Sequence, residues 1–249
     1  MRRTAPLVAL VLLLGLALSA SATARSGHTC IKGNELWFRS ADGIRLVGHR
    51  FGGTRPGAKP AVVLAHMSNG DLCEWLPFAR NLAGKGLFVF AFDFRGHGFS
   101  EGRPAYGRLA VDVAAAVKAV RGLGARNVVV MGASLGGIAA VVGAANIRPP
   151  LDGVVAVSAP ATIAGRLSAL PSAPRLRVPA LYIAAEQDQN DPYDFAADAK
   201  RLYEATGSPD KRLELVPGAL HGVFLVNGSG PVRALLERFS RDPRAAVRT

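Results

Sequence analysis

Val128-Val129-Val130-Met131-Gly132-Ala133-Ser134-Leu135-Gly136-Gly137 is the stretch of this chain that decides its fold class. Its β-branched start predicts a buried strand, and the apolar residues that continue to Asn146 predict a helix. The turn between them has the pattern G-x-S-x-G, in which glycines leave room for a sharp, strained turn that carries a nucleophilic serine. The helix would begin beside that serine and direct the Leu135 amide at developing negative charge. Ser134 is therefore the candidate nucleophile, and Leu135 is a candidate oxyanion donor.

A dinucleotide-binding loop is the competing interpretation of this glycine-rich turn. Such a loop has the spacing G-x-G-x-x-G and an acid that ends the following strand about 20 residues further on. Asp152 lies near that distance, but it precedes the apolar run 153–157 instead of ending it. The glycine spacing also differs, so the nucleophile turn is favoured.

A serine nucleophile needs a general base, and the chain offers five histidines. His221 lies in the loop after the last expected strand, Arg212–Val216, from which an imidazole could reach a central nucleophile. The other four lie near the N-terminus, in an expected hairpin or in turns after earlier strands: His28, His49, His66 and His97. His221 is therefore the candidate base.

Three carboxylates that follow the expected strand Ala180–Ala184 compete for the role of orienting acid. Asp188 is the first choice, and Glu186 and Asp191 are the alternatives. Asp191 directly precedes Pro192 and is typical of a helix cap. The order Ser134, Asp188, His221 is that of the α/β-hydrolases and differs from those of chymotrypsin and subtilisin.

Strand and helix patterns alternate along most of the chain, which predicts a mostly parallel sheet covered by helices on both faces. Two segments around Ala41-Asp42-Gly43 predict an antiparallel hairpin at its start. Only about 22 residues separate the expected strands 153–157 and 180–184, enough for a short helix or a flap but not for a folded cap. We expect one domain over residues 35–249.

The chain resembles the α/β-hydrolase-fold serine hydrolases, in particular the small capless esterases and dienelactone-hydrolase-like members. Besides the serine turn, the matching segments are Phe92-Asp93-Phe94-Arg95-Gly96-His97-Gly98-Phe99-Ser100 and Val216-Pro217-Gly218-Ala219-Leu220-His221-Gly222. The resemblance implies an eight-stranded sheet whose second strand is antiparallel, and hydrolysis of esters or related acyl compounds. It also implies that Asp93 and Arg95 to Gly98 form a turn that borders the site.

One segment departs from the family pattern. The family usually has His-Gly after its third strand, and the amide just beyond that glycine is the second oxyanion donor. Here the sequence is Leu64-Ala65-His66-Met67-Ser68-Asn69-Gly70, with Met67 in place of the glycine. The resemblance therefore implies Ser68 as donor, with Met67 as second choice, and the Met67 side chain is expected to narrow the site.

Residues 1–24 combine Arg2 and Arg3, an apolar stretch and small residues that end in Ala22-Thr23-Ala24, as a secretory signal peptide does. We expect cleavage after Ala24 and a mature N-terminal extension over residues 25–34, so that the protein is secreted or retained at the cell envelope; an uncleaved anchor is the alternative.

The two cysteines, Cys30 and Cys73, are expected to form a disulfide in an oxidising compartment, since two separate thiols are the less favoured arrangement. Closing that loop would stabilise the fold by about 4 kcal/mol.

Composition limits the classes of function. The 249 residues are 49% hydrophobic, a composition that excludes a disordered chain, and their formal charge is +12. The arginines are scattered and are not interleaved with aromatic residues, so we expect no nucleic-acid partner. No metal-binding motif occurs, and we expect neither metal nor cofactor.

The expected activity is hydrolysis of a small-molecule ester; the alternatives are a serine peptidase or amidase, and a weakly active binding protein. Stable membrane insertion is not expected after signal cleavage, and the oligomeric state is left open.

Overall fold

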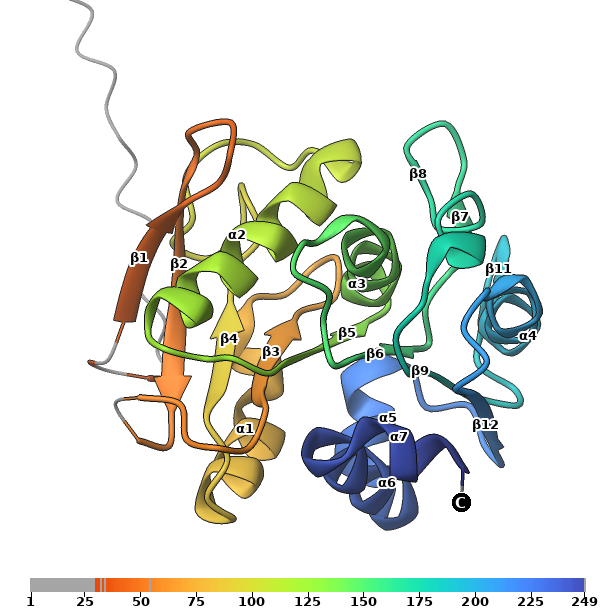
Figure 1. Ribbon diagram of the computed structural model, residues 1–249. Helices are drawn as coiled ribbons and strands as arrows, with labels where there is room; N and C mark the ends of the chain where they lie inside the picture. The colour runs from red at the N-terminus through yellow and green to blue at the C-terminus, as the bar shows by residue number, and fades with distance from the viewer. Residues whose placement is uncertain (1–29, 32, 34, 54, 249) are drawn as a thin grey trace, which may run out of the picture.

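A single eight-stranded sheet forms the centre of the molecule in a computed structural model that describes residues 30–31, 33, 35–53 and 55–248 (Figure 1). The expected signal peptide, 1–24, and most of the expected extension lie outside the described residues. The strand order is β1-β2-β4-β3-β5-β6-β9-β12. The bounds are β1 Glu35–Arg39, β2 Arg45–Phe51, β3 Ala61–Ala65, β4 Val89–Phe92, β5 Val128–Ala133, β6 Gly153–Val157, β9 Ala180–Ala185 and β12 Lys211–Val216.

Strand β2 is antiparallel to both of its neighbours, β1 and β4, and every later pairing in this sheet is parallel. The predicted N-terminal hairpin and the family's antiparallel second strand are thereby confirmed. The parallel strands β3, β5, β6, β9 and β12 end at the same edge of the sheet. The loops that leave this edge carry the candidate site residues, as is usual in open α/β sheets.

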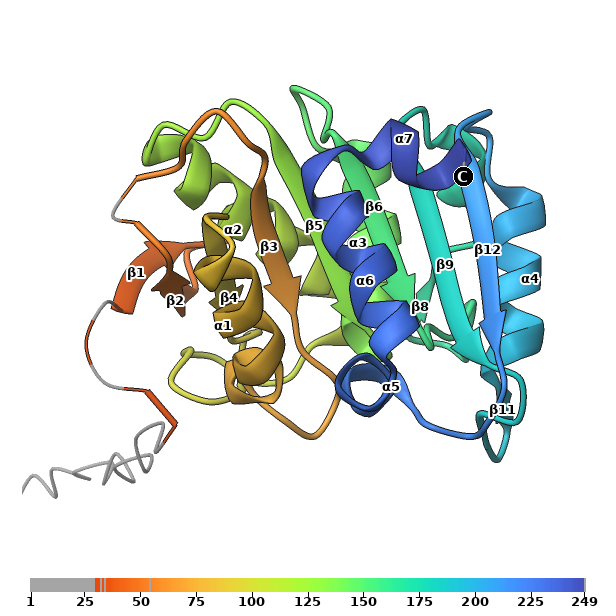
Figure 2. The same cartoon turned by 90° about the horizontal axis from the view of Figure 1, so that it is seen from below.

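Helices cover both faces of the sheet, as predicted. Helices α2, α3 and α4 share one buried apolar cluster with the sheet, and α1, α5, α6 and α7 share the other. Figure 2 shows α1, α5, α6 and α7 in front of the strands. The bounds are α1 Leu76–Gly84, α2 Leu109–Gly122, α3 Leu135–Asn146, α4 Phe195–Ala205, α5 Gly222–Gly228, α6 Gly230–Arg241 and α7 Pro243–Arg248.

The start of α4 differs from the sequence prediction. The expected helix 192–206 begins only at Phe195, because the preceding residues form a small antiparallel hairpin of β10 (Gln189–Asn190) and β11 (Tyr193–Asp194). Asp194 caps the helix by accepting a hydrogen bond from the Ala197 amide at 2.9 Å. The prediction that Asp191 caps this helix was therefore wrong.

The segment between β6 and β9 holds a flap and no folded cap. Strands β7 (Thr162–Ile163) and β8 (Leu167–Ser168) form a two-stranded hairpin, and a short 3₁₀ helix, Ala173–Arg175, follows. The Thr162 and Ser168 hydroxyls are hydrogen-bonded across the hairpin at 2.8 Å. This hairpin stands above the carboxyl edge of the sheet and forms part of the wall of the site described below.

The predicted disulfide is confirmed: Cys30 and Cys73 are joined, with their Cα atoms 5.9 Å apart. Cys73 belongs to a 3₁₀ helix, Leu72–Trp75, that directly precedes α1. The bridge therefore fixes the N-terminal segment to the turn between β3 and α1, next to the expected oxyanion loop.

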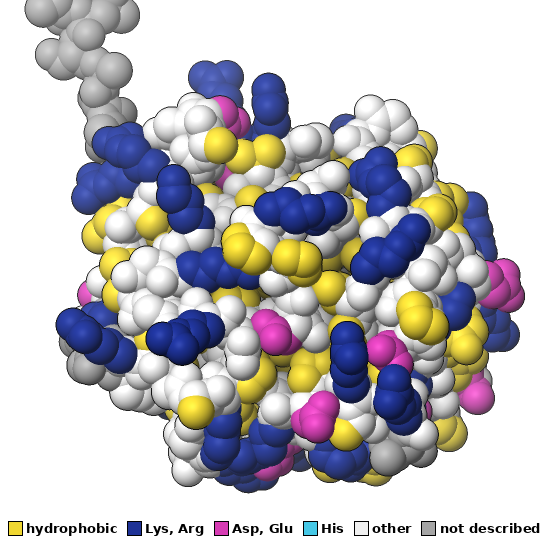
Figure 3. Space-filling model, viewed as in Figure 1, with side chains coloured by type: hydrophobic (Ala, Val, Ile, Leu, Met, Phe, Trp, Pro, Cys, Tyr) yellow, Lys and Arg dark blue, Asp and Glu magenta, His cyan; other side chains and the backbone are white. Residues whose placement is uncertain are grey.

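The molecular surface fits the expectation of dispersed charge. On the face drawn in Figure 3, Lys and Arg side chains are scattered and interspersed with Asp and Glu. Across the described part of the chain, no helix has the length and apolar character needed to cross a bilayer, and no cluster of three or more His, Cys, Asp or Glu side chains is arranged to hold a metal ion.

Candidate active site

Ser134 occupies the turn between β5 and α3 in a strained backbone conformation. Its φ of 50° and ψ of −116° are unfavourable for a residue with a side chain. The Ser134 amide donates a hydrogen bond to the Val157 carbonyl of the neighbouring strand at 2.8 Å, which holds the turn against β6. A Cβ at Gly132 would lie 2.1 Å from the Gly136 carbonyl oxygen, so this turn is too tight for a side chain there.

His221 and Asp188 form a hydrogen-bonded pair. Nδ1 of His221 lies 3.0 Å and 3.1 Å from the two carboxylate oxygens of Asp188. A carboxylate only accepts hydrogen bonds, so Nδ1 is the donor, and in the neutral ring Nε2 keeps its lone pair. Asp188 is 2% exposed, so its carboxylate is shielded from water, whereas the His221 ring is only partly buried. This arrangement suits an imidazole that takes a proton at Nε2.

The two alternative acids lie elsewhere. Glu186 and Asp191 are exposed, on either side of Asp188 in the loop after β9. Among the described residues, Asp188 is the carboxylate that contacts the His221 ring.

Two further contacts hold the His221 loop in place. The buried Ser158 hydroxyl, at the end of β6, accepts a hydrogen bond from the Gly222 amide at 2.9 Å. The Phe195 ring packs on the imidazole, with the ring centroids 4.3 Å apart. Ser158 and Phe195 thus fix the position of His221 from two other elements of the fold.

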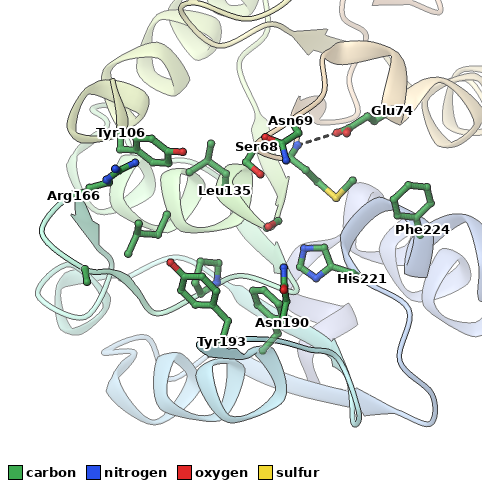
Figure 4. A pocket seen from close by; sticks show the side chains of 16 residues that line it. Ser68, Asn69, Glu74, Tyr106, Leu135, Arg166, Asn190, Tyr193, His221 and Phe224 are labelled. Atoms are coloured by element: carbon green, nitrogen blue, oxygen red, sulfur yellow. Dashed lines mark hydrogen bonds between the residues drawn. The ribbon is translucent and has the colours of Figure 1, made fainter. Parts of the chain in front are cut away.

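Ser134 and His221 line one cavity of about 630 Å³ at the carboxyl edge of the sheet. In Figure 4, the wall with Ser68 and Leu135 faces the wall with His221, Asn190 and Tyr193. The described hydrogen bonds of the His221 ring go to Asp188, and none joins it directly to the Ser134 hydroxyl. In unliganded enzymes such bonds are often long and shorten when substrate binds.

The amides of Leu135 and Ser68 fit an oxyanion site. Leu135 is the first residue of α3, where a helix leaves its amides without an internal acceptor. Neither amide donates a hydrogen bond to another described residue. The Met67 amide, in contrast, donates to Glu74 Oε2 at 2.9 Å. Because that amide is already engaged, the second choice, Met67, is not supported as a donor.

The segment expected to form a turn bordering the site supports the Ser68 loop. Both carboxylate oxygens of the buried Asp93 accept backbone hydrogen bonds, from the amides of Leu72 and Phe99, each at 2.9 Å. His97 Nε2 lies 3.0 Å from the Ser68 carbonyl oxygen. These contacts hold the peptide after Ser68 and the start of the 3₁₀ helix beyond it.

The Met67 side chain lies against the loop that carries the candidate base. It is buried, and a Cβ at Gly222 would lie 2.4 Å from its sulfur. Gly222 has a φ of 54° and directly follows His221. The residue that replaces the family glycine therefore fills the space between the oxyanion loop and the base loop, in agreement with the expected narrowing of the site.

Glu74 adds a carboxylate to this cavity. Burial raises the pKa of its side chain above the ordinary value of 4.5, and the hydrogen bond from the Met67 amide acts in the opposite direction. The ionised form is thus less favourable in the folded protein than in the unfolded chain. This contribution to stability is present at acid pH and is lost as the pH rises through the raised pKa.

We expect Glu74→Gln to be more stable than the wild-type protein at neutral pH, with the difference vanishing at acid pH. Glutamine keeps an acceptor for the Met67 amide but removes the half-buried charge. Urea unfolding between about pH 4 and about pH 7 measures the difference, with the exposed Glu204→Gln as a matched control. A variant that is less stable at neutral pH would show that the ionised carboxylate stabilises the loop.

Sequence reasoning missed two of the residues that shape this site. Ser158 carried one signal, since a serine directly after an apolar strand lies at the functional edge of a parallel sheet. Glu74 carried no such signal in the sequence. Its contact with the Met67 amide depends on how the loop after β3 folds back on itself.

Comparison with known proteins agrees with this architecture. A family model described as serine aminopeptidase, S33, matches residues 56–171. An uncharacterised protein of Mycobacterium tuberculosis H37Rv, Rv2307c, is 32% identical over 210 residues, which cover 76% of this chain and 72% of that protein.

Two solved structures illustrate the similarity of fold. The Pyrococcus furiosus esterase Pf2001 superposes with a TM-score of 0.69 at 18% identity, over 82% of this chain and 88% of that structure. The enol-lactonase of Burkholderia xenovorans LB400 gives a TM-score of 0.66 at 19% identity, over 82% and 99% of the two chains. At these identities the likeness concerns the fold alone.

Proposed function

Because the chain belongs to the α/β-hydrolase family, we propose that this hydrolase is an exported serine esterase acting on small carboxylic esters. One observation carries the proposal. Ser134, on its strained turn, lines the same cavity as a histidine whose Nδ1 is paired with a buried carboxylate. Nucleophile, base and orienting acid are the three parts that acyl transfer through serine requires.

The proposed reaction begins when His221 Nε2 accepts the Ser134 proton and Oγ attacks the ester carbonyl carbon. The carbonyl oxygen becomes an oxyanion that accepts hydrogen bonds from the amides of Leu135 and Ser68. The imidazolium, stabilised by Asp188, then protonates the leaving alcohol as the C–O bond breaks. His221 then takes a proton from water, whose oxygen attacks the acyl carbon. As the bond between that carbon and Ser134 Oγ breaks, His221 protonates Oγ and the carboxylic acid is released.

Export is supported by two features. Residues 1–24 have the composition of a secretory signal peptide. Cys30 and Cys73 form a disulfide, a bond that persists mainly in oxidising compartments outside the cytosol. We therefore place the mature protein outside the cytoplasm, either free or at the cell envelope.

We expect p-nitrophenyl esters of short and medium acyl chains to be hydrolysed faster than long-chain esters, since the cavity has a volume of about 630 Å³ and is bordered by a hairpin flap instead of a folded cap. Turnover of a chain-length series, combined with fluorophosphonate labelling, measures this. A clear optimum at long chains would contradict the expected acyl preference. An unlabelled, inactive native protein would instead favour a binding protein that retained the fold.

Aminopeptidase activity is the second candidate, favoured by the description of the matching family model. A peptidase that takes free N-termini needs an anion for the substrate ammonium, and Glu74 is the carboxylate that lines the cavity. Amino-acid p-nitroanilides assayed beside p-nitrophenyl esters separate the two activities. We expect the esters to be cleaved faster, because Glu74 already accepts the Met67 amide.

A further inference from the structure

The two ends of the cavity carry opposite charge. Glu74 and Arg166 are the acidic and the basic side chain among the residues that line it, His221 aside. In Figure 4, Glu74 and Phe224 lie at one end, and Tyr106 and Arg166 lie at the other. The wall with Ser68 and Leu135 lies between them. A substrate bound at Ser134 would therefore reach a cation on one side.

Arg166 is presented by the tip of the β7–β8 hairpin. Its amide donates to the Ile163 carbonyl at 3.0 Å, which closes the turn. The guanidinium lies over the Tyr106 ring, 5.0 Å from the centroid. The aromatic ring orients a planar cation of this kind but leaves its N–H donors available.

Among residues 30–31, 33, 35–53 and 55–248, no carboxylate forms an ion pair with the Arg166 guanidinium. Arg95 shows the opposite case: it is 5% exposed and forms ion pairs with Asp42 and Asp112. The guanidinium donors of Arg95 are thus bound within the fold. The exposed Arg166 side chain instead lines the cavity, and its N–H groups donate no hydrogen bond to any of the described residues.

The chemistry of the proposed ester hydrolysis determines which arm of the substrate meets Arg166. His221 must protonate the leaving oxygen, so the alcohol lies on the His221 side of Ser134. The acyl arm then extends the other way, toward Tyr106 and Arg166. Apolar side chains also line the cavity and suit methylene groups, among them Ile163 of β7, in the hairpin that carries Arg166, and Pro160 just before that strand.

We propose that Arg166 selects acyl groups that end in a carboxylate, so that hemiesters of short dicarboxylic acids are the preferred substrate class. This proposal rests on the proposed esterase activity at Ser134. The apolar wall binds the methylenes, and the guanidinium binds the distal carboxylate through paired N–H donors, the geometry for which arginine is suited.

The test compares three substrates of one chain length: mono-p-nitrophenyl adipate, p-nitrophenyl hexanoate and p-nitrophenyl 6-aminohexanoate. Their acyl arms end in a carboxylate, a methyl and an ammonium group. For the full mature protein, we expect kcat/KM to be highest for the adipate and lowest for the aminohexanoate. Because the chain carries a charge of +12, the series is repeated at high salt, where general attraction of anions is screened.

Substitution of Arg166 separates a specific contact from the general field. We expect Arg166→Met to lower the ratio of adipate to hexanoate kcat/KM by about tenfold, a typical effect of one lost charge-assisted hydrogen bond. Arg166→Lys should fall between the two. Arg126→Met is the matched control, because it removes the same charge from an exposed residue. Arg126 precedes the start of β5, whereas Ser134 follows the end of that strand, so the ratio of adipate to hexanoate kcat/KM should stay unchanged.

The outcomes distinguish failure of the Arg166 proposal from failure of the esterase proposal. Equal rates for adipate and hexanoate in the wild-type protein, or an unchanged ratio in Arg166→Met, overturn the role of Arg166 while the esterase function stands. Fastest cleavage of the aminohexanoate also overturns it and favours Glu74 as the charge that binds substrate. No cleavage of any ester, together with no fluorophosphonate labelling, overturns both proposals.

Discussion

Ser134→Ala is expected to lower ester turnover by about five to six orders of magnitude, the loss typical of removing a serine nucleophile. The substitution deletes the oxygen that would form the acyl-enzyme. The oxyanion amides and the His221–Asp188 pair stay in place. Residual activity of about 10³-fold over water would come from those donors and from substrate binding.

The folded state should tolerate this change. The turn is held by backbone hydrogen bonds, from the Ser134 amide to Val157 and from the Gly137 amide to the Ser134 carbonyl. Alanine preserves both, so the unfolding midpoint should be close to that of the wild-type protein. Active sites that hold strained conformations also gain stability in some variants of this kind.

Ser229→Ala is the matched control for the Ser134 variant. The Ser229 hydroxyl caps α6 by accepting a hydrogen bond from the Val232 amide at 3.3 Å. Its loss should cost about 1 kcal/mol of stability and leave ester turnover unchanged. Fluorophosphonate labelling followed by peptide mapping gives the second readout. Full labelling of Ser134→Ala, or turnover near the wild-type rate, would contradict the assignment of the nucleophile.

The fold could be predicted from the sequence for those strands whose structure depends on burial alone. The apolar runs 153–157 and 180–184 were expected as strands and lie in the sheet, since strands buried on both faces need continuous apolar residues. Short elements could not be predicted from the sequence. The hairpins β7–β8 and β10–β11 have two residues in each strand, too few for any periodicity.

The residues of the candidate site also fall into two groups: those that the sequence identifies and those that only the folded structure identifies. Ser134, Asp188 and His221 were chosen because a short motif and the chain order of loops after strands restrict them. Ser158 and Arg166 act through contacts that only the folded chain creates: the first with the Gly222 amide, the second with the Tyr106 ring. Local patterns in the sequence contain no information on such pairs when the loops that bring them together are irregular.

Asp188→Asn is expected to lower kcat by about 10⁴, as removal of the orienting carboxylate does in serine proteases. Asparagine can donate its amide hydrogens to Nδ1, which would move the imidazole proton to Nε2. In that tautomer His221 cannot accept the Ser134 proton, although the two side chains stay in contact. The loss should therefore appear in kcat with little change in fold, measured by ester turnover and by near-UV circular dichroism.

The loop after β9 provides matched controls, because Glu186→Gln and Asp191→Asn each remove one exposed carboxylate close to Asp188. Both variants should keep turnover within about twofold, since surface charges outside a site have small effects. A second control is non-additivity: Asp188→Asn should cost far less in a His221→Ala background than alone, because the two residues act as a unit. If Glu186→Gln or Asp191→Asn abolished turnover while Asp188→Asn retained it, the carboxylate that orients the base would have been misassigned. If the two losses were additive, Asp188 would act on turnover by a route other than the His221 imidazole.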